Sequence, residues 1–157
     1  MSRSANAYQA LAEFRYLIRC YLNSAGTAAE SVGLEPQQYL AMLQLRGLPS
    51  NQEPTVRILA DRLQIRHHTA TELINRMEKR GLPRRERSSK DRRSVLLHLT
   101  PRGEKLLSRL VRQRLTELRV AAPALVHALR SVIARRAQSR NGALEKGSGA
   151  IADQKVS

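Results

Sequence analysis

The chain has 157 residues, of which 41% are hydrophobic, so it is long enough to bury the core of one domain of ordinary size. Its 28 Lys and Arg residues against 13 Asp and Glu residues give a formal net charge of +15, which favours polyanionic partners such as nucleic acid or an anionic membrane. The basic excess is concentrated, since residues 76–119 hold fifteen basic and five acidic residues whereas residues 1–58 hold five basic and four acidic ones. We therefore expect a charged binding face rather than an evenly solvated surface.

The sequence also excludes several classes of protein. Cys20 is the single cysteine, so neither an intrachain disulfide nor a cysteine-based zinc cluster can form. No apolar run approaches the length of a membrane span, and the N-terminus lacks the apolar core of a signal peptide. No catalytic constellation or phosphate loop is present, and the adjacent His67 and His68 diverge around a helix start instead of forming a metal site. We expect a reduced, cytoplasmic protein with no enzymatic activity, no cofactor and no membrane partner.

Two helices are predicted in the first 47 residues. The first covers about residues 5–25, where apolar side chains recur every four and three residues and form one narrow stripe. The stripe consists of Ala7, Leu11, Phe14, Ile18, Tyr21 and Ala25. Such a stripe is typical of a coiled-coil-like seam within or between subunits, and Cys20 beside it is interpreted as a small packing residue. Pro36 opens the second helix, and Gly47 ends it.

Residues 55–80 predict a helix-turn-helix. Thr55 is a suitable N-cap for a short helix, residues 64–66 form a tight turn, and a second helix covers about residues 67–80. The apolar residues of this second helix are spaced so that they share one face. They are Ala70, Leu73, Ile74 and Met77. The remaining, polar faces of the helix are therefore available for a partner.

Two short strands joined by a charged loop are predicted next. Gly81 ends the preceding helix, and the strands cover residues 84–87 and 94–99. Residues 84–93 include six basic and two acidic residues. A helix-turn-helix followed by a basic hairpin is a winged helix-turn-helix, so the predicted fold class is mainly α with a small two-stranded β-wing.

One long helical segment follows the predicted wing. Thr100 and Pro101 supply an N-cap and a first-turn proline, and Pro123 is expected to break or restart the helix. Beyond about residue 138 the composition turns to Gly, Ser, Ala, Asn and Lys, so residues 139–157 are interpreted as a disordered tail.

We expect residues 1–157 to form a single domain. In it, a helical dimerisation region of residues 5–34 and 101–138 accompanies the winged helix-turn-helix of residues 35–100. The residues assigned to dimerisation are apolar residues of the predicted helices. They are Leu11, Phe14, Ile18, Leu115, Leu118, Leu125, Leu129 and Ile133.

An ordered set of motifs resembles the MarR (multiple antibiotic resistance regulator) family of transcriptional regulators. The resemblance covers about residues 8–138, and its specificity lies in the order of the motifs. They are the helix-turn-helix segments 59–70 and 73–82, the basic strand 84–87, the Asp-Arg-Arg tip 91–93 and the segment 97–103, which contains Leu-Thr-Pro. The chain departs from the family at Pro83, where the family usually has an apolar residue. Because proline cannot donate a ladder hydrogen bond, we expect the first strand to start later or its edge to be unpaired.

The resemblance implies a homodimer whose N-terminal and C-terminal helices interlock and whose two winged domains bind a pseudo-palindromic operator in double-stranded DNA. It also implies a small phenolic or anionic effector in a crevice between the dimerisation and DNA-binding parts, or, in other members, an oxidant-sensing cysteine. We therefore expect a sequence-specific, ligand-responsive transcriptional regulator, more often a repressor than an activator. Two alternatives stay open: a nonspecific architectural nucleic-acid-binding protein, and a redox-sensing regulator that acts through Cys20.

The candidate DNA contacts are polar residues of the wing and of the second helix of the helix-turn-helix, about residues 67–80. A helix fits the major groove, where side chains near its N-terminus discriminate bases, whereas Lys and Arg further along contact phosphates. The alternative is that Thr69 contacts only phosphate and Glu72 is merely solvated. By resemblance, Asp91 braces the hairpin tip while Arg92 or Arg93 enters the minor groove, and the alternative is a flexible charged hairpin. The candidates are His67, His68, Thr69, Thr71, Glu72, Arg76, Lys79, Arg85, Arg87, Lys90, Asp91, Arg92 and Arg93.

Overall fold

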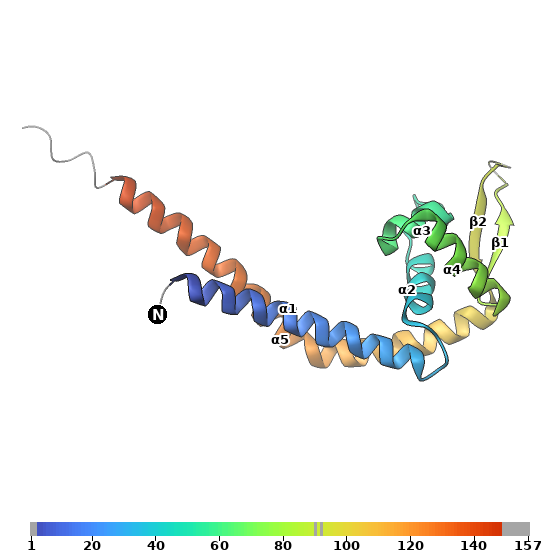
Figure 1. The fold of residues 1–157 in the computed structure, drawn as a ribbon, viewed down its shortest axis with the longest axis horizontal. Coiled ribbons are helices and arrows are strands. Elements are labelled where there is room, and N and C mark those ends of the chain that lie inside the picture. The colour runs from blue at the N-terminus through green and yellow to red at the C-terminus, as the bar shows by residue number, and fades with distance from the viewer. Residues whose placement is uncertain (1–2, 90, 92, 149–157) are drawn as a thin grey trace, which may run out of the picture. The chain divides into compact units, whose positions relative to one another are not determined.

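The computed structural model describes residues 3–89, 91 and 93–148, and it is mainly helical with a two-stranded antiparallel hairpin, as the sequence predicts (Figure 1). The elements follow in the order α1 (Arg3–Glu30), α2 (Pro36–Arg46), α3 (Val56–Leu63), α4 (His67–Lys79), β1 (Pro83–Arg87), β2 (Val95–Leu99) and α5 (Pro101–Ser148). They divide into two compact units. The helical unit consists of residues 3–22 of α1 and 117–148 of α5, and the winged unit consists of residues 23–116.

In the winged unit, α1, α3 and α4 end in the same hydrogen-bonded turn. Gly33, Gln64 and Gly81 follow these helices with positive φ angles of 72°, 55° and 66°. In each turn the amide of that residue donates to the carbonyl three residues earlier, and the next amide donates to the carbonyl five residues before it. This is the Schellman arrangement, which glycine adopts without steric cost. Gln64 adopts the same backbone conformation although it is not a glycine, and its side-chain Nε2 donates to the carbonyl of Asp61 at 2.7 Å.

The core of the winged unit decides which side of α4 faces solvent. Thr55 caps α3 as predicted, because its Oγ1 accepts a hydrogen bond from the amide of Ile58 at 3.3 Å. The four apolar residues predicted for α4 are all buried. Burial of a side chain such as Ile74 or Met77, each 0% exposed, stabilises the fold by roughly 1.5–3 kcal/mol. The opposite, polar side of α4 therefore stays outside the core.

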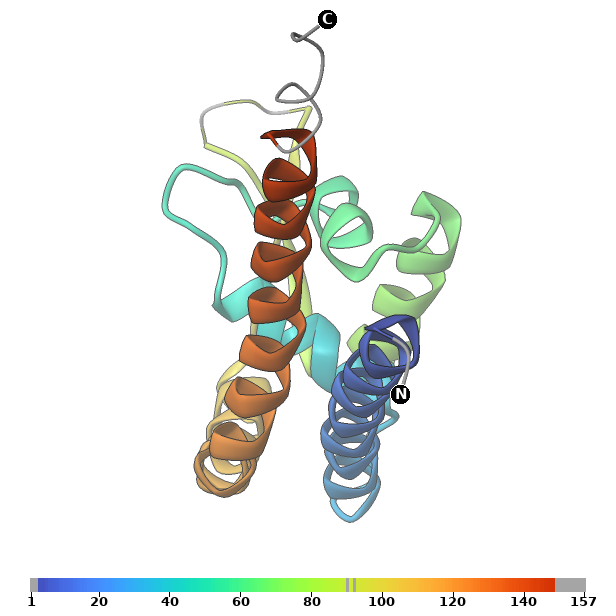
Figure 2. The same ribbon diagram turned by 90° about the vertical axis from the view of Figure 1, so that its left-hand side faces the viewer.

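The wing is the slender hairpin of β1 and β2 (Figures 1 and 2), and its first strand begins at Pro83. This corrects the expectation that the proline would delay the strand or leave its edge unpaired, since Pro83 pairs with Leu99. The amide of Thr100 donates to the carbonyl of Leu82 at 2.9 Å, which places Pro83 at a non-hydrogen-bonded position of the antiparallel ladder. At such a position the backbone nitrogen points away from the partner strand. The missing N–H of proline therefore removes no ladder hydrogen bond.

Helix α5 starts against the base of the wing. Thr100 caps it as predicted, because its Oγ1 accepts a hydrogen bond from the amide of Gly103 at 3.1 Å. The same hydroxyl donates to the carbonyl of Gly81 at 2.6 Å. One threonine thus joins the end of α4 to the beginning of α5.

Two expectations about the C-terminal part of the chain differ from the structure. Pro123 lies inside α5 and does not end it. A proline removes one backbone hydrogen bond, and a long helix can accommodate this as a bend. Helix α5 extends to Ser148, so residues 139–148 of the expected tail are helical, and their Ala-Leu-Glu-Lys stretch at 143–146 consists of strong helix formers. The rest of that tail lies outside the described residues.

Candidate nucleic-acid interface

The side of α4 that faces away from the core carries a continuous set of polar side chains. Its exposed residues are His67, His68, Thr69, Glu72, Asn75, Arg76 and Lys79. Thr71 is half-buried, and its Oγ1 donates to the carbonyl of His67 at 3.0 Å. The structure therefore brings the sequence candidates of this helix to one solvent-facing side, although the hydroxyl of Thr71 is already bonded to the backbone.

On the wing, Arg85 is tied to α4. Its guanidinium forms an ion pair with Glu78 and donates to Oδ1 of Asn75 at 2.9 Å. Its backbone amide donates to Oε1 of Glu78 at 3.1 Å. Arg87, two residues further along β1, is exposed. The candidate Arg85 thus fixes β1 on α4, and part of its charge is neutralised within the protein.

The tip of the wing is ordered by a short aspartate turn. Oδ1 of Asp91 accepts a hydrogen bond from the backbone amide of Arg93 at 2.9 Å. The amide of Asp91 donates to Oγ of Ser88 at 3.4 Å. Asp91 therefore braces the backbone at Arg93, whose side chain is exposed. Two other candidates, Lys90 and Arg92, lie outside the described residues.

An open concavity of about 680 Å³ lies where the beginning of α3, the beginning of α4 and the wing meet. It brings together four candidates that are distant in the sequence: His67, Thr71, Arg85 and Arg93. Arg57 also lines it, is exposed, and was missed by the sequence analysis. Its position two residues after the N-cap Thr55 was visible in the sequence, but only the folded chain brings it opposite the wing. The concavity thus brings a cation of α3, Arg57, together with Arg85 of β1 and Arg93 of the wing tip.

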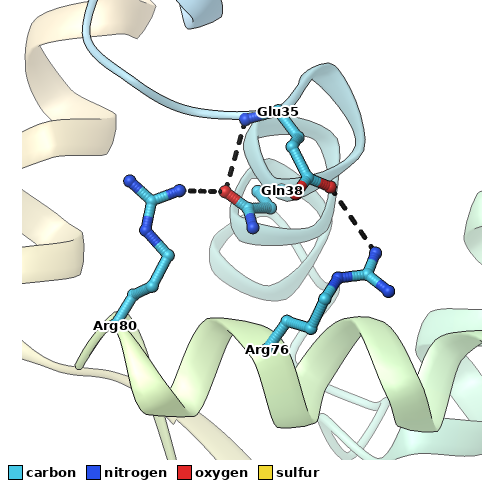
Figure 3. A network of polar contacts seen from close by, with 4 residues as sticks. All are labelled: Glu35, Gln38, Arg76 and Arg80. Carbon is cyan, nitrogen blue, oxygen red and sulfur yellow. Dashed lines mark hydrogen bonds and ion pairs between the residues drawn. The ribbon is translucent and has the colours of Figure 1, made fainter.

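Arg76 of α4 and Arg80, the C-cap residue directly after α4, contact the beginning of α2 (Figure 3). Nη2 of Arg76 lies 3.5 Å from Oε2 of Glu35, and both side chains are more than half exposed. Arg80 donates to Oε1 of Gln38 and to the carbonyl of Gly33, each at 2.6 Å. Gln38 is 1% exposed and also accepts a hydrogen bond from the amide of Glu35 at 3.3 Å. Arg80 and Gln38 could not be identified from the sequence, because nothing in the sequence indicates which polar residue of α2 is buried.

Apolar side chains remain exposed on the helical unit, which has Ala10 and Ala128 among its buried residues. Three predicted dimerisation residues, Leu11, Leu129 and Ile133, are exposed. The others in this unit, Phe14, Ile18, Leu118 and Leu125, are half-buried, and Leu115 in the winged unit is exposed. Further exposed apolar residues of the helical unit are Tyr8, Tyr16, Leu22, Val120 and Val126. Exposed apolar residues in this number are typical of a surface that binds a partner.

Tyr16 and Cys20 lie one helical turn apart on α1, and Cys20 is exposed. The pKa of the Tyr16 hydroxyl is raised above its ordinary value of 10.0. The largest cause is the hydrogen bond with the side chain of Cys20, followed by the charge of Cys20, the loss of solvent contact and the charge of Glu13. The hydroxyl therefore stays protonated and available to donate to the sulfur.

A family model described as the MarR family matches residues 32–94. An uncharacterized HTH-type transcriptional regulator of Bacillus subtilis (strain 168), YsmB, is 31% identical over 86 residues, which are 55% of this chain and 57% of that protein. The organic hydroperoxide resistance transcriptional regulator of the same organism is 39% identical over 74 residues, which are 47% of this chain and 48% of that protein. The chain thus spans about half the length of these curated relatives.

Solved structures share the fold over most of the chain. A MarR family transcription regulator, SP03579, superposes with a TM-score of 0.66 at 20% identity and covers 97% of this chain and 96% of its own. A mutant of S. aureus MepR bound to an oligodeoxyribonucleotide superposes with a TM-score of 0.58 at 18% identity, over 83% of this chain and 94% of its own. At these identities the likeness establishes the fold.

The helices that the structure describes include none with the length and apolar character of a membrane span. In the same part of the chain, no three or more His, Cys, Asp or Glu side chains come together in a group that could hold a metal ion.

Proposed function

We propose that the chain is a transcriptional regulator of the MarR family, whose model matches residues 32–94, and that it binds double-stranded DNA as a homodimer and represses transcription from a pseudo-palindromic operator. The observation that carries the proposal is the polar, exposed side of α4 next to a basic wing. The DNA-bound S. aureus protein of the same fold supports it. As an alternative, the same basic surface would serve a nonspecific architectural protein.

The exposed side of α4 supplies the contacts in this proposal. Helix α4 lies in the major groove with His68, Thr69 and Glu72 of its N-terminal half at the base edges. Arg76 and Lys79, further along the same helix, contact phosphates and set the register of the helix. The wing follows the adjacent backbone, and the exposed cations near its tip enter the minor groove.

The exposed apolar residues of the helical unit support the dimer in this proposal. Leaving side chains such as Val120 (81% exposed) and Ile133 (60% exposed) in water has no structural benefit for a monomer. A second copy buries them and presents two α4 helices to successive major grooves about 34 Å apart. Analytical ultracentrifugation tests this step, and a monomer at micromolar concentration contradicts it.

The proposed function includes a small anionic effector, which is supported by a cavity of the winged unit. A cavity of about 530 Å³ there has Val32, Leu82 and Leu106 among its apolar lining residues. Its cationic lining residues are Arg80, Arg102, Lys105 and Arg109, and no carboxylate lines it. An anion with an apolar body matches this combination. Benzoate is then expected to release bound DNA at concentrations at which the neutral benzamide does not, and equal effects of the two compounds contradict the proposal.

A second candidate is a redox response through Cys20. It is supported by the exposure of the thiol, by the Tyr16 side chain one helical turn away on α1, and by the function of the hydroperoxide-resistance relative. In this candidate a hydroperoxide oxidises the Cys20 thiol of one subunit to a sulfenic acid and leaves as the alcohol, and the reduced Cys20 thiol of the partner subunit then displaces water to form the disulfide. A Cys20→Ser variant that still releases DNA on peroxide treatment excludes it.

The DNA-binding proposal is tested by a gel shift with the region upstream of the protein's own gene. We expect a complex that persists in excess competitor DNA. If unlabelled upstream DNA and unrelated competitor DNA displace the complex at the same concentration, and binding depends steeply on salt, the nonspecific alternative is supported instead.

A further inference from the structure

We propose that Arg80 is a positioning residue for DNA recognition, which fixes α4 on α2 through Gln38 and does not itself contact DNA. The proposal rests on the DNA-binding function proposed above. Figure 3 draws the hydrogen bond from Arg80 to Gln38, which connects the end of α4 with the first turn of α2, and a second bond from Arg80 reaches the carbonyl of Gly33 in the turn before α2.

The guanidinium of Arg80 spans two acceptors from different parts of the chain. Nη1 donates to Oε1 of Gln38, and Nη2 donates to the carbonyl of Gly33, both at 2.6 Å. Gly33 lies 47 residues before Arg80 in the sequence and Gln38 lies 42 residues before it. A planar guanidinium can bond two acceptors in a fixed relative orientation, whereas an ammonium group acts as a point charge. The contact therefore restrains both the position and the rotation of the end of α4.

Gln38 is an unusual acceptor because its side chain is buried. It is 1% exposed, and its Oε1 accepts from both Arg80 and the amide of Glu35. Removing a partner from a buried polar group costs about 1–3 kcal/mol, because water cannot replace it. The buried Oε1 of Gln38 thus relies on Arg80 as a hydrogen-bond donor, whereas the Oε1 of an exposed glutamine could bond to water.

Arg76, one turn earlier on α4, differs from Arg80 in its surroundings. Its side chain is 54% exposed and meets Glu35 at 3.5 Å, so it can exchange that carboxylate for a phosphate at little cost. Arg80 is half-buried, and its two terminal nitrogens are both bonded to the protein. We assign phosphate binding to Arg76 and positioning to Arg80.

The positioning role has a measurable consequence for base recognition. Side chains such as Thr69 must be held within about 0.5 Å and 10–20° of a productive geometry to discriminate bases. A loosened α4 keeps its charge pattern and loses this orientation. The loss of Arg80 therefore lowers selectivity between sequences and leaves the number of phosphate contacts unchanged.

The test compares Arg80→Met with Arg62→Met in the full chain. Arg62 donates to Oε1 of Gln44 at 2.6 Å and so forms the same kind of hydrogen bond, here between α3 and α2. With the duplex that the wild-type protein enriches from a random pool, Arg80→Met is expected to weaken binding about tenfold relative to competitor DNA. Its salt dependence is expected to match that of the wild type, and Arg62→Met is expected to keep the wild-type selectivity.

Hydrogen exchange without DNA tests the contact independently of the proposed function. Arg80→Met is expected to speed exchange of the amides in the C-terminal half of α4, and Gln38→Glu, which keeps the acceptor, is expected to preserve wild-type exchange. Unchanged exchange in Arg80→Met overturns the positioning role. The positioning role is also overturned if Arg80→Met reduces the slope of log affinity against log salt concentration by about 0.9, because that change marks Arg80 as a phosphate contact. If the wild type enriches no sequence, the proposed function fails, while the exchange experiment still decides the structural part.

Discussion

Gly103, in the first turn of α5, lies so close to the carbonyl oxygen of Leu82 that no Cβ atom fits between them. The amide of Thr100 donates to the same carbonyl at 2.9 Å, which holds the base of the wing and the beginning of α5 together. Gly103 is buried. The requirement for glycine here is one of space, since its φ angle is not in the left-handed region.

Gly103→Ala is therefore expected to lower the free energy of unfolding by about 2–3 kcal/mol, although alanine ordinarily favours a helix. Gly26→Ala in α1 is the matched control, because its Cβ would meet Cγ of Pro36 at an ordinary 3.4 Å. The control is expected to raise the free energy of unfolding by up to about 1 kcal/mol. Urea unfolding measures both, and equal effects of the two substitutions contradict the close approach.

Pro83 gives a second prediction for the wing. In Pro83→Ala the new amide gains no ladder acceptor, and the unfolded chain gains freedom, so the free energy of unfolding is expected to fall by about 1–2 kcal/mol. The pairing of β1 with β2 is expected to stay in register, since the position is not hydrogen-bonded. Nuclear Overhauser contacts between the strands check the register. A more stable variant with an extra ladder hydrogen bond contradicts the assigned position.

Helix α4 and Pro83 illustrate how much of the fold could be predicted from the sequence. The period of Ala70, Leu73, Ile74 and Met77 predicted the buried side of α4, because local spacing alone determines which side chains share a face. The sequence also showed that Pro83 cannot donate a hydrogen bond. It could not show which positions of the ladder need a donor, because that depends on the register with β2.

The candidate site was predictable to a similar extent. The polar residues of α4 were found by elimination, once its apolar residues had been assigned to the core. The contacts of Arg85 with Glu78 and of Arg80 with Gln38 were missed, because they depend on how separate elements pack. Arg57 was missed for the same reason.

Glu35 is expected to compete with DNA for Arg76. Both side chains of this ion pair are more than half exposed, so Glu35→Gln changes stability little. The freed Arg76 and the lost negative charge are expected to raise DNA affinity by about two- to fivefold at low salt. Glu30→Gln is the control, because it removes the same charge from the exposed end of α1. Fluorescence anisotropy measures both, and an equal gain in the two variants shows a general charge effect instead.

The Tyr16–Cys20 contact predicts a specific pH dependence. Because the hydrogen bond with Cys20 is the main cause of the raised Tyr16 pKa, Cys20→Ala is expected to return that pKa toward 10.0. By proton linkage, a raised pKa in the folded protein means that the contact favours protonated Tyr16. Its contribution to stability is fully present below pH 10.0 and is lost as the pH rises through the higher folded pKa. Carbon-13 NMR of the tyrosine ring follows the titration, and an unchanged midpoint in Cys20→Ala rules the contact out.

In the proposed function the exposed side of α4, presented twice by a dimer, recognises DNA sequence. Selection of duplexes by the wild-type protein from a random pool, followed by sequencing of the bound fraction, tests this recognition. We expect an enriched motif of two half-sites related by a twofold axis, with centres one helical turn of about 10–10.5 base pairs apart or a multiple of it. A bound fraction with the same sequence composition as the starting pool contradicts it.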